Sequence, residues 1–96
     1  MWDVVFRPEA KRDIVRATRW YAKENSRLGE AFADAVDATI ATVLENPYLY
    51  AIVKRQSRRA RVKGFRHGIY YRIVEDHVVI TACTHFRRHP KHWRAG

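Results

Sequence analysis

The sequence predicts an α+β domain in which an N-terminal helical hairpin packs against an antiparallel sheet. Three observations carry this prediction. Apolar residues recur at helical spacing through residues 8–45, β-branched and aromatic runs follow residue 60, and a short apolar run opens the chain. The chain has 96 residues, 47% of them hydrophobic, so residues 1–96 are expected to form a single domain.

The first expected elements are a strand and a long helix. Residues 2–6 (WDVVF) have the composition of a strand. Pro8 then stands where a first helical residue is favoured, and the helix is expected to end near Asn25. Its apolar stripe comprises Ala10, Ile14, Ala17 and either Trp20 or Tyr21. Its basic residues fall on other faces: Arg12, Arg16, Arg19 and Lys23.

A second helix is expected directly after Asn25 and Ser26, which are typical N-cap residues. Its stripe comprises Leu28, Phe32, Val36 or Ala35, Ile40 or Thr39, Val43 and Leu44. The Asn46-Pro47 pair ends it. Because the connection is so short, the two helices must lie antiparallel, and both stripes need a sheet to cover them.

The remaining strands are expected at residues 60–62, 69–74 (IYYRIV) and 78–83 (VVITAC), with a polar turn at 75–77. The last run is nearly all apolar, as in a strand buried on both faces. The predicted order is therefore β-α-α-β-β-β, with the final three strands as an antiparallel meander. Tyr70 and Tyr71 should point to opposite faces, one toward the core and one toward the exposed side.

Positive charge is concentrated in the second half of the chain. The net charge is +9, yet residues 1–53 carry −1 and residues 54–96 carry +10, with no acid between Glu45 and Glu75. Such a surface attracts an anion, either nucleic acid or an acidic protein.

The sequence also indicates a cytoplasmic protein. No apolar run approaches the roughly 20 residues needed to cross a bilayer, so no membrane association is expected. The first ten residues lack the pattern of a signal peptide, and the single cysteine, Cys83, excludes an internal disulfide.

A histidine-rich segment near the C-terminus raises the question of a metal site. Its zinc-ligand types follow a C-x-H-x3-H-x2-H spacing: Cys83, His85, His89 and His92. A strand edge followed by Pro90 would not point all four at one centre, so neither a metal nor another cofactor is predicted.

Two other chemistries deserve consideration for this half of the chain. Metal-free RNA cleavage needs an acid, a base and cations on the phosphate, and the candidate acid/base groups are His67, Tyr70, Tyr71 and His85. The tail also interleaves basic and aromatic residues, which favours weak, nonspecific nucleic-acid binding. No helix-turn-helix pattern is present, because the helical hairpin is committed to the core.

The ordered series of segments resembles the RelE/ParE superfamily of type II toxin–antitoxin toxins over nearly the whole chain. The segments are A-x-x-D-I-x-x-A-x-x-W-Y (10–21), L-G-x-x-F (28–32), N-P-Y (46–48), R-R (58–59), G-F-x-x-G-I-Y-Y-R (64–72) and H-x-R-R-x-P-x-x-W (85–93). The tail and the W-Y and G-I-Y-Y-R segments resemble the ParE-type branch in particular. Two residues depart from that pattern: Arg66 replaces a proline and His89 replaces an aspartate.

The resemblance implies a toxin that inhibits DNA gyrase by binding, without a catalytic centre. The RelE and YoeB branches instead cleave mRNA on the ribosome with an acid/base residue near the C-terminal end, which leaves His85 and Tyr71 as the alternative catalytic residues.

The resemblance also implies a cognate acidic antitoxin that folds on binding. Residues expected to meet its acidic side chains are Arg58, Arg59 and Arg61. The tail is expected to contact the target or the antitoxin through Arg87, Arg88, Lys91 and Trp93. His85 would orient this tail from the end of the last strand.

Overall fold

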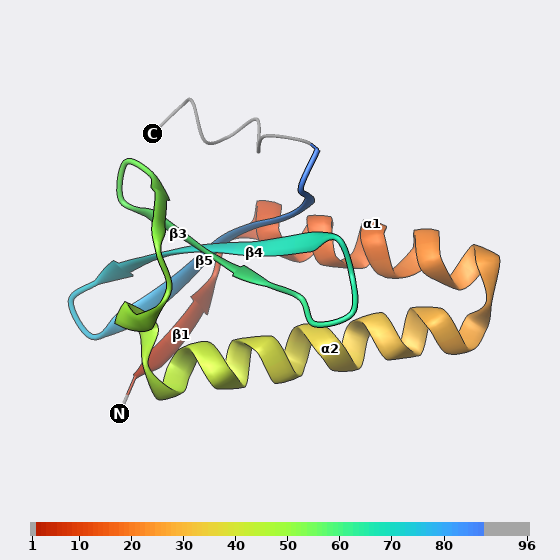
Figure 1. Ribbon diagram of the computed structural model, residues 1–96, viewed down its shortest axis with the longest axis horizontal. Coiled ribbons are helices and arrows are strands. Elements are labelled where there is room, and N and C mark those ends of the chain that lie inside the picture. Colours follow the sequence, from red (N-terminus) through yellow and green to blue (C-terminus); the bar gives the residue numbers. More distant parts are fainter. Residues whose placement is uncertain (1, 88–96) are drawn as a thin grey trace.

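The structure, a computed structural model, describes residues 2–87 (Figure 1). Its elements are β1 (Asp3–Phe6), α1 (Pro8–Glu24), α2 (Ser26–Glu45), the 3-10 turn η1 (Pro47–Leu49), β2 (Ile52–Lys54), β3 (Ser57–Arg61), β4 (His67–Val74) and β5 (His77–His85). Both helices begin and end within a residue or so of the predicted positions. Within this part of the chain, no helix is both long and apolar enough to span a membrane.

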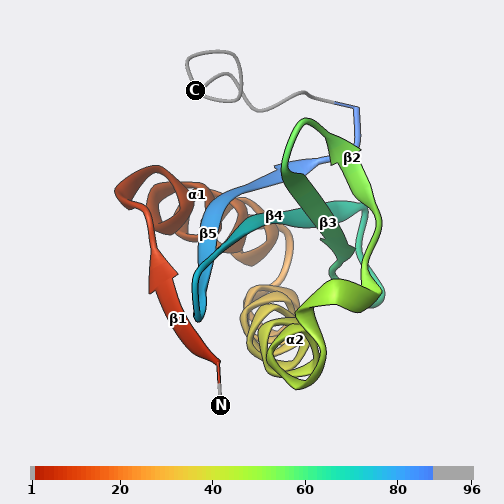
Figure 2. The ribbon, with the colours of Figure 1, turned by 90° about the vertical axis from the view of Figure 1, so that its left-hand side faces the viewer.

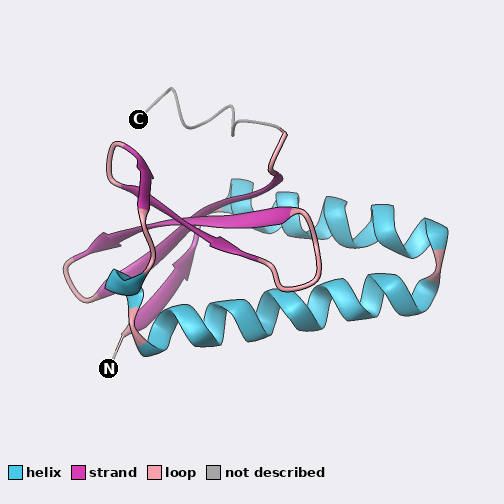
Figure 3. Cartoon of the chain, in the orientation of Figure 1, coloured by secondary structure: helices cyan, strands magenta, loops and turns pink. Residues whose placement is uncertain are grey.

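The predicted helical hairpin is confirmed (Figure 3). One residue, Asn25, ends α1 and caps α2: its extended backbone breaks the helix, and its Oδ1 accepts a hydrogen bond from the Arg27 N–H at 2.8 Å. The helices then approach closely at Gly29. A Cβ at this position would lie 2.7 Å from the Cβ of Ala22, so only glycine permits this spacing.

The strands form one five-stranded sheet in the order β1-β5-β4-β3-β2. The antiparallel meander of the last three strands is confirmed, as is the α+β class. Two details were not predicted. The sheet is mixed, because β1 pairs with β5 in parallel, from Asp3 opposite His77 to Phe6 opposite Ile80. An additional strand, β2, pairs with β3 at the other edge.

The helices and the sheet share one hydrophobic core. In Figure 2, α1 lies beside β5 and α2 lies under β4 and β3. The core residues are Ala10, Ala17, Phe32, Val36, Ile40 and Val43 from the helices, and Ala60, Val62, Ile69, Tyr71, Val78, Ile80 and Cys83 from the sheet and the residue after β3. The prediction that β5 is buried on both faces was wrong, because buried residues such as Val78 alternate with half-buried ones such as Val79.

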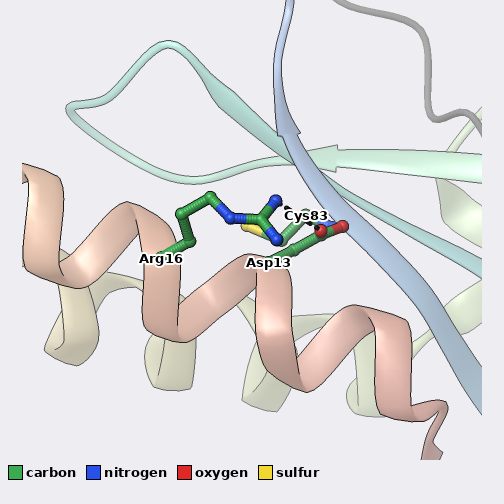
Figure 4. A network of polar contacts seen from close by, with 3 residues as sticks. All are labelled: Asp13, Arg16 and Cys83. Atoms are coloured by element: carbon green, nitrogen blue, oxygen red, sulfur yellow. Dashed lines mark hydrogen bonds and ion pairs between the residues drawn. The ribbon is translucent and has the colours of Figure 1, made fainter.

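A carboxylate fixes α1 to the edge of β5 (Figure 4). The pairing of β5 with β1 ends where the Arg7 N–H donates a hydrogen bond to the Ile80 carbonyl, at 2.9 Å. Beyond that point, Asp13 Oδ2 accepts the N–H of Cys83 at 3.0 Å, and Asp13 Oδ1 lies 3.7 Å from Arg16 Nη1. The Asp13 carboxylate therefore takes over the role of a strand partner for the Cys83 amide.

Candidate anion-binding face

The sheet face turned away from the core is basic. Alternation along β3 and β4 puts Ala60, Ile69 and Tyr71 in the core. The opposite face therefore carries Arg59, Arg61, Gly68, Tyr70 and Arg72. Arg59 and Arg61 are both exposed, and they pair across the ladder with Tyr70 and Gly68.

Two guanidinium groups on this face share one aromatic ring. The Cζ atoms of Arg59 and Arg61 lie 4.8 Å and 5.4 Å from the centre of the Phe86 ring. We call these three residues the arginine pad. Gly68 makes room for it, because a Cβ there would come within 2.9 Å of Arg59 Cγ and Phe86 Cε1. Two like charges on one ring repel each other, so an anion bound there is favoured.

Two further polar atoms belong to the same face. Arg72 Nε and Thr84 Oγ1 are buried and have no hydrogen-bond partner among residues 2–87. Thr84 lies opposite Gly68 in the ladder, next to the arginine pad. Both atoms can donate hydrogen bonds, although both are covered by neighbouring atoms.

A pair of histidines lies across the ends of β4 and β5. His67 and His85 are register partners, with ring centres 5.4 Å apart. His67 is buried, and its Nδ1 lies 3.2 Å from the hydroxyl of Tyr21. Burial, with a smaller contribution from neighbouring His85, lowers the pKa of His67 to about 4. His67 is therefore neutral at pH 7.

His85 holds the start of the tail. Its Nδ1 accepts a hydrogen bond from the backbone N–H of Arg87 at 3.1 Å, and the Phe86 N–H donates to the Arg66 carbonyl at 2.9 Å. Arg87 is exposed. The other tail residues considered above lie outside the described residues: Arg88, His89, Lys91, His92 and Trp93.

The two tyrosines of β4 are both buried. Tyr71 faces the core, and its hydroxyl donates a hydrogen bond to the Pro47 carbonyl at 2.6 Å. Burial raises the pKa of Tyr71 to about 12, although neighbouring Arg58 lowers it in part. Tyr70 lies on the opposite face, yet only 2% of it is exposed. The expectation that one of them would be exposed was wrong.

Arg58 and Cys83 serve the fold. Arg58 is half-buried, and its Nη1 donates to the carbonyls of Tyr48 and Tyr50, which fixes the segment between α2 and β2. Cys83 is buried, and burial followed by the nearby Asp13 charge raises the pKa of its thiol to about 12.

Sequence reasoning missed how this face is assembled. Phe86 lies in the basic and aromatic tail of the sequence, yet its ring contacts the guanidinium groups of Arg59 and Arg61. One available signal was Gly68, because glycine inside a strand often marks a close approach of other groups. Nothing in the local sequence connects residues 59–61 with residue 86.

Comparison with solved structures places the fold among proteins of toxin–antitoxin systems. A chain of the chromosomal ParDE TA system from P. aeruginosa matches with a TM-score of 0.78 and 9% identity, covering 88% of this chain and 96% of that one. YafQ from E. coli matches at 0.61 and 10% identity (91% and 96% covered), and the YoeB dimer from Staphylococcus aureus at 0.60 and 14% (88% and 95%). No curated protein matches the sequence.

These similarities show an α+β fold of the ParE/RelE-like type. Residues 4–90 match the family described as the ParE toxin of the type II toxin–antitoxin system parDE. The chain belongs to this ParE toxin family.

Proposed function

We propose that this ParE-family toxin inhibits DNA gyrase by binding it and that a cognate acidic antitoxin neutralises it. The family match over residues 4–90 is the observation that carries the proposal. The TM-scores support the ParE-type branch, because the ParDE chain matches with a TM-score of 0.78, whereas YafQ and YoeB match with 0.61 and 0.60.

The charge of the described surface supports an acidic partner. Residues 54–96 carry +10, and the exposed arginines of the arginine pad lie on the open sheet face. Similar chains occur in a chromosomal ParDE TA system and in a heterotetrameric YoeB–YefM toxin–antitoxin complex. An acidic segment that folds on binding would neutralise this face through charge-assisted hydrogen bonds to arginine.

The candidate acid/base residues also support inhibition by binding. The Tyr71 hydroxyl is engaged with the Pro47 carbonyl inside the core, and His67 is neutral and buried against Tyr21. His85 Nδ1 is occupied by the Arg87 amide. These contacts give each group a role in holding the fold or the start of the tail.

A paired assay on antitoxin-free toxin tests the proposal. One arm follows gyrase supercoiling and the accumulation of cleaved DNA, and the other follows mRNA cleavage on translating ribosomes. We expect gyrase inhibition with intact mRNA. Arg59→Glu with Arg61→Glu should weaken inhibition at least about tenfold, because like charges placed together in an interface cost several kcal/mol and about 1.4 kcal/mol corresponds to a factor of ten.

The matched control is Arg27→Glu with Lys63→Glu. Both side chains are exposed and do not belong to the arginine pad, and the net charge changes by the same amount. The control should inhibit gyrase almost as well as the unaltered toxin. Equal loss of inhibition in both variants would show that the arginine pad acts only through the net charge of the toxin. Normal gyrase activity in the presence of the unaltered toxin would refute the proposal.

Ribosome-dependent mRNA cleavage is the second candidate function. The observation that favours it is the His67–His85 pair, formed by the first residue of β4 and the last residue of β5. Cleaved mRNA with normal gyrase, lost on His85→Ala at an unchanged unfolding temperature, would establish this function in place of gyrase inhibition.

A further inference from the structure

The outer face of α1 carries a second basic surface, separate from the arginine pad. Six side chains line one hollow there: Arg12, Val15, Arg16, Arg19, Trp20 and Lys23. We call them the α1 stripe. The buried residues of the same helix, Ala10 and Ala17, face the core, so the stripe faces outward. Trp20 is 59% exposed and Val15 is 47% exposed, so two large apolar side chains are open to solvent on the outer side of this helix.

The cations of the α1 stripe form a row along the helix. Arg12, Arg16, Arg19 and Lys23 follow one another at intervals of four, three and four residues, so they share one side over about 16 Å. Asp13, which follows Arg12 directly in the sequence, is turned inward to the Cys83 amide, with its side chain only 12% exposed. It pairs with Arg16 but leaves the remaining cations available.

We infer that the α1 stripe docks an acidic amphipathic helix of a partner protein. A partner helix has the same repeat of three and four residues, so carboxylates spaced in that way would each meet one cation of the row. Apolar residues on the same helix would cover Trp20 and Val15, which flank the row. The inference rests on the proposed function in one respect, because the antitoxin is the partner that would supply this helix.

Other occupants fit the α1 stripe less well. Residues 88–96 of this chain contain three basic residues and no acid, so they are repelled by it. A second copy of the chain would bring one row of cations against another. A nucleic-acid backbone satisfies the charges, but it offers nothing to cover the exposed valine, and an acidic helix satisfies both features.

The test uses the full-length, antitoxin-free toxin and a fluorescently labelled designed peptide. The peptide is helical, with glutamates at intervals of four, three and four residues and leucines beside them. A second peptide has the same composition with its glutamates distributed around the helix, and a short DNA duplex is the third probe. Binding is measured by anisotropy, and circular dichroism verifies that each toxin variant is folded.

We expect the patterned peptide to bind at least tenfold more tightly than the scattered one. Arg12→Glu with Arg19→Glu should weaken its binding at least tenfold, and Trp20→Ala should weaken it severalfold. The matched control, Arg27→Glu with Lys63→Glu, should change it less than threefold. Both altered pairs are exposed, and neither Arg12 nor Arg19 has a described side-chain contact that folding requires.

Three results would overturn the inference. They are equal binding of the two peptides, equal loss in the two charge-reversed variants, and tighter binding of the duplex that is lost on reversal of Arg12 and Arg19. The last result would assign the surface to nucleic acid. None of these measurements involves gyrase or ribosomes. Their failure would therefore refute the docking surface without refuting the proposed function, and failure of the gyrase assay would not refute the docking surface.

Discussion

Removal of the buried hydroxyl of Tyr71 distinguishes a structural role of this residue from a catalytic one. In Tyr71→Phe the ring remains, including its edge contact with Tyr50, and only the hydroxyl is lost. The hydroxyl donates to the Pro47 carbonyl at 2.6 Å, in the segment that follows α2. The substitution therefore removes one buried hydrogen bond and leaves the carbonyl without that donor.

The expected loss of stability follows from these two effects. A net hydrogen bond contributes about 1 kcal/mol, and a buried polar group left without a partner costs about 1–3 kcal/mol. We expect Tyr71→Phe to lower the free energy of unfolding by about 1–3 kcal/mol. For a domain of this size, each kcal/mol corresponds to a fall in Tm of roughly 4–8 °C.

Urea and thermal unfolding, followed by circular dichroism, measure the effect. Tyr48→Phe is the control, because Tyr48 is exposed and should change stability by less than about 0.5 kcal/mol. Toxin activity per folded molecule should survive in Tyr71→Phe. A variant with unchanged stability that has lost mRNA cleavage would refute the reasoning and make the hydroxyl a chemical group.

Three further predictions concern stability. Asp13→Ala should cost about 1–3 kcal/mol in urea unfolding, because the Cys83 amide loses its acceptor, and Asp13→Asn should recover much of this. Gly29→Ala should destabilise the protein, despite the higher helix propensity of alanine (about 1 kcal/mol), because the new Cβ meets Ala22; a gain in Tm would contradict the close approach. Stability should also fall as the pH drops from about 6.5 to about 4, because His67 takes up a proton more readily in the unfolded chain than in the folded one. The fall should be smaller in His67→Gln. The same pH profile of stability in this variant and in the unaltered protein would contradict the prediction.

The helices could be predicted because their signals are local. The buried apolar residues of α2, such as Phe32, Val36 and Val43, recur at helical spacing. Asn25 and Pro47 mark the two ends of this helix. The strand β2 could not, since all three of its residues are exposed and leave no burial pattern. The parallel pairing of β1 with β5 joins residues more than 70 positions apart, and local sequence does not encode such pairing.

The candidate site was predicted by residue type more than by arrangement. Arg59 and Arg61 lie on the open face, in accord with the charge pattern, but Arg58 is turned toward the Tyr48 and Tyr50 carbonyls by strand alternation. The link from Asp13 to Cys83 also joins distant parts of the chain. Each of these roles depends on tertiary contacts that the sequence pattern leaves open.

Charged side chains are distributed over the folded surface differently from their distribution along the sequence. Residues 1–53 are nearly neutral, yet they contain the cationic α1 stripe, because four exposed acids of this half lie on α2: Glu30, Asp34, Asp37 and Glu45. Screening limits charge interactions to about 8 Å at physiological salt, so a partner responds to local clusters and not to the average over a half-chain. An acidic partner is therefore attracted to α1 and to the arginine pad, and repelled by α2. Such a pattern favours one orientation of the partner over others, which is how complementary charge contributes specificity.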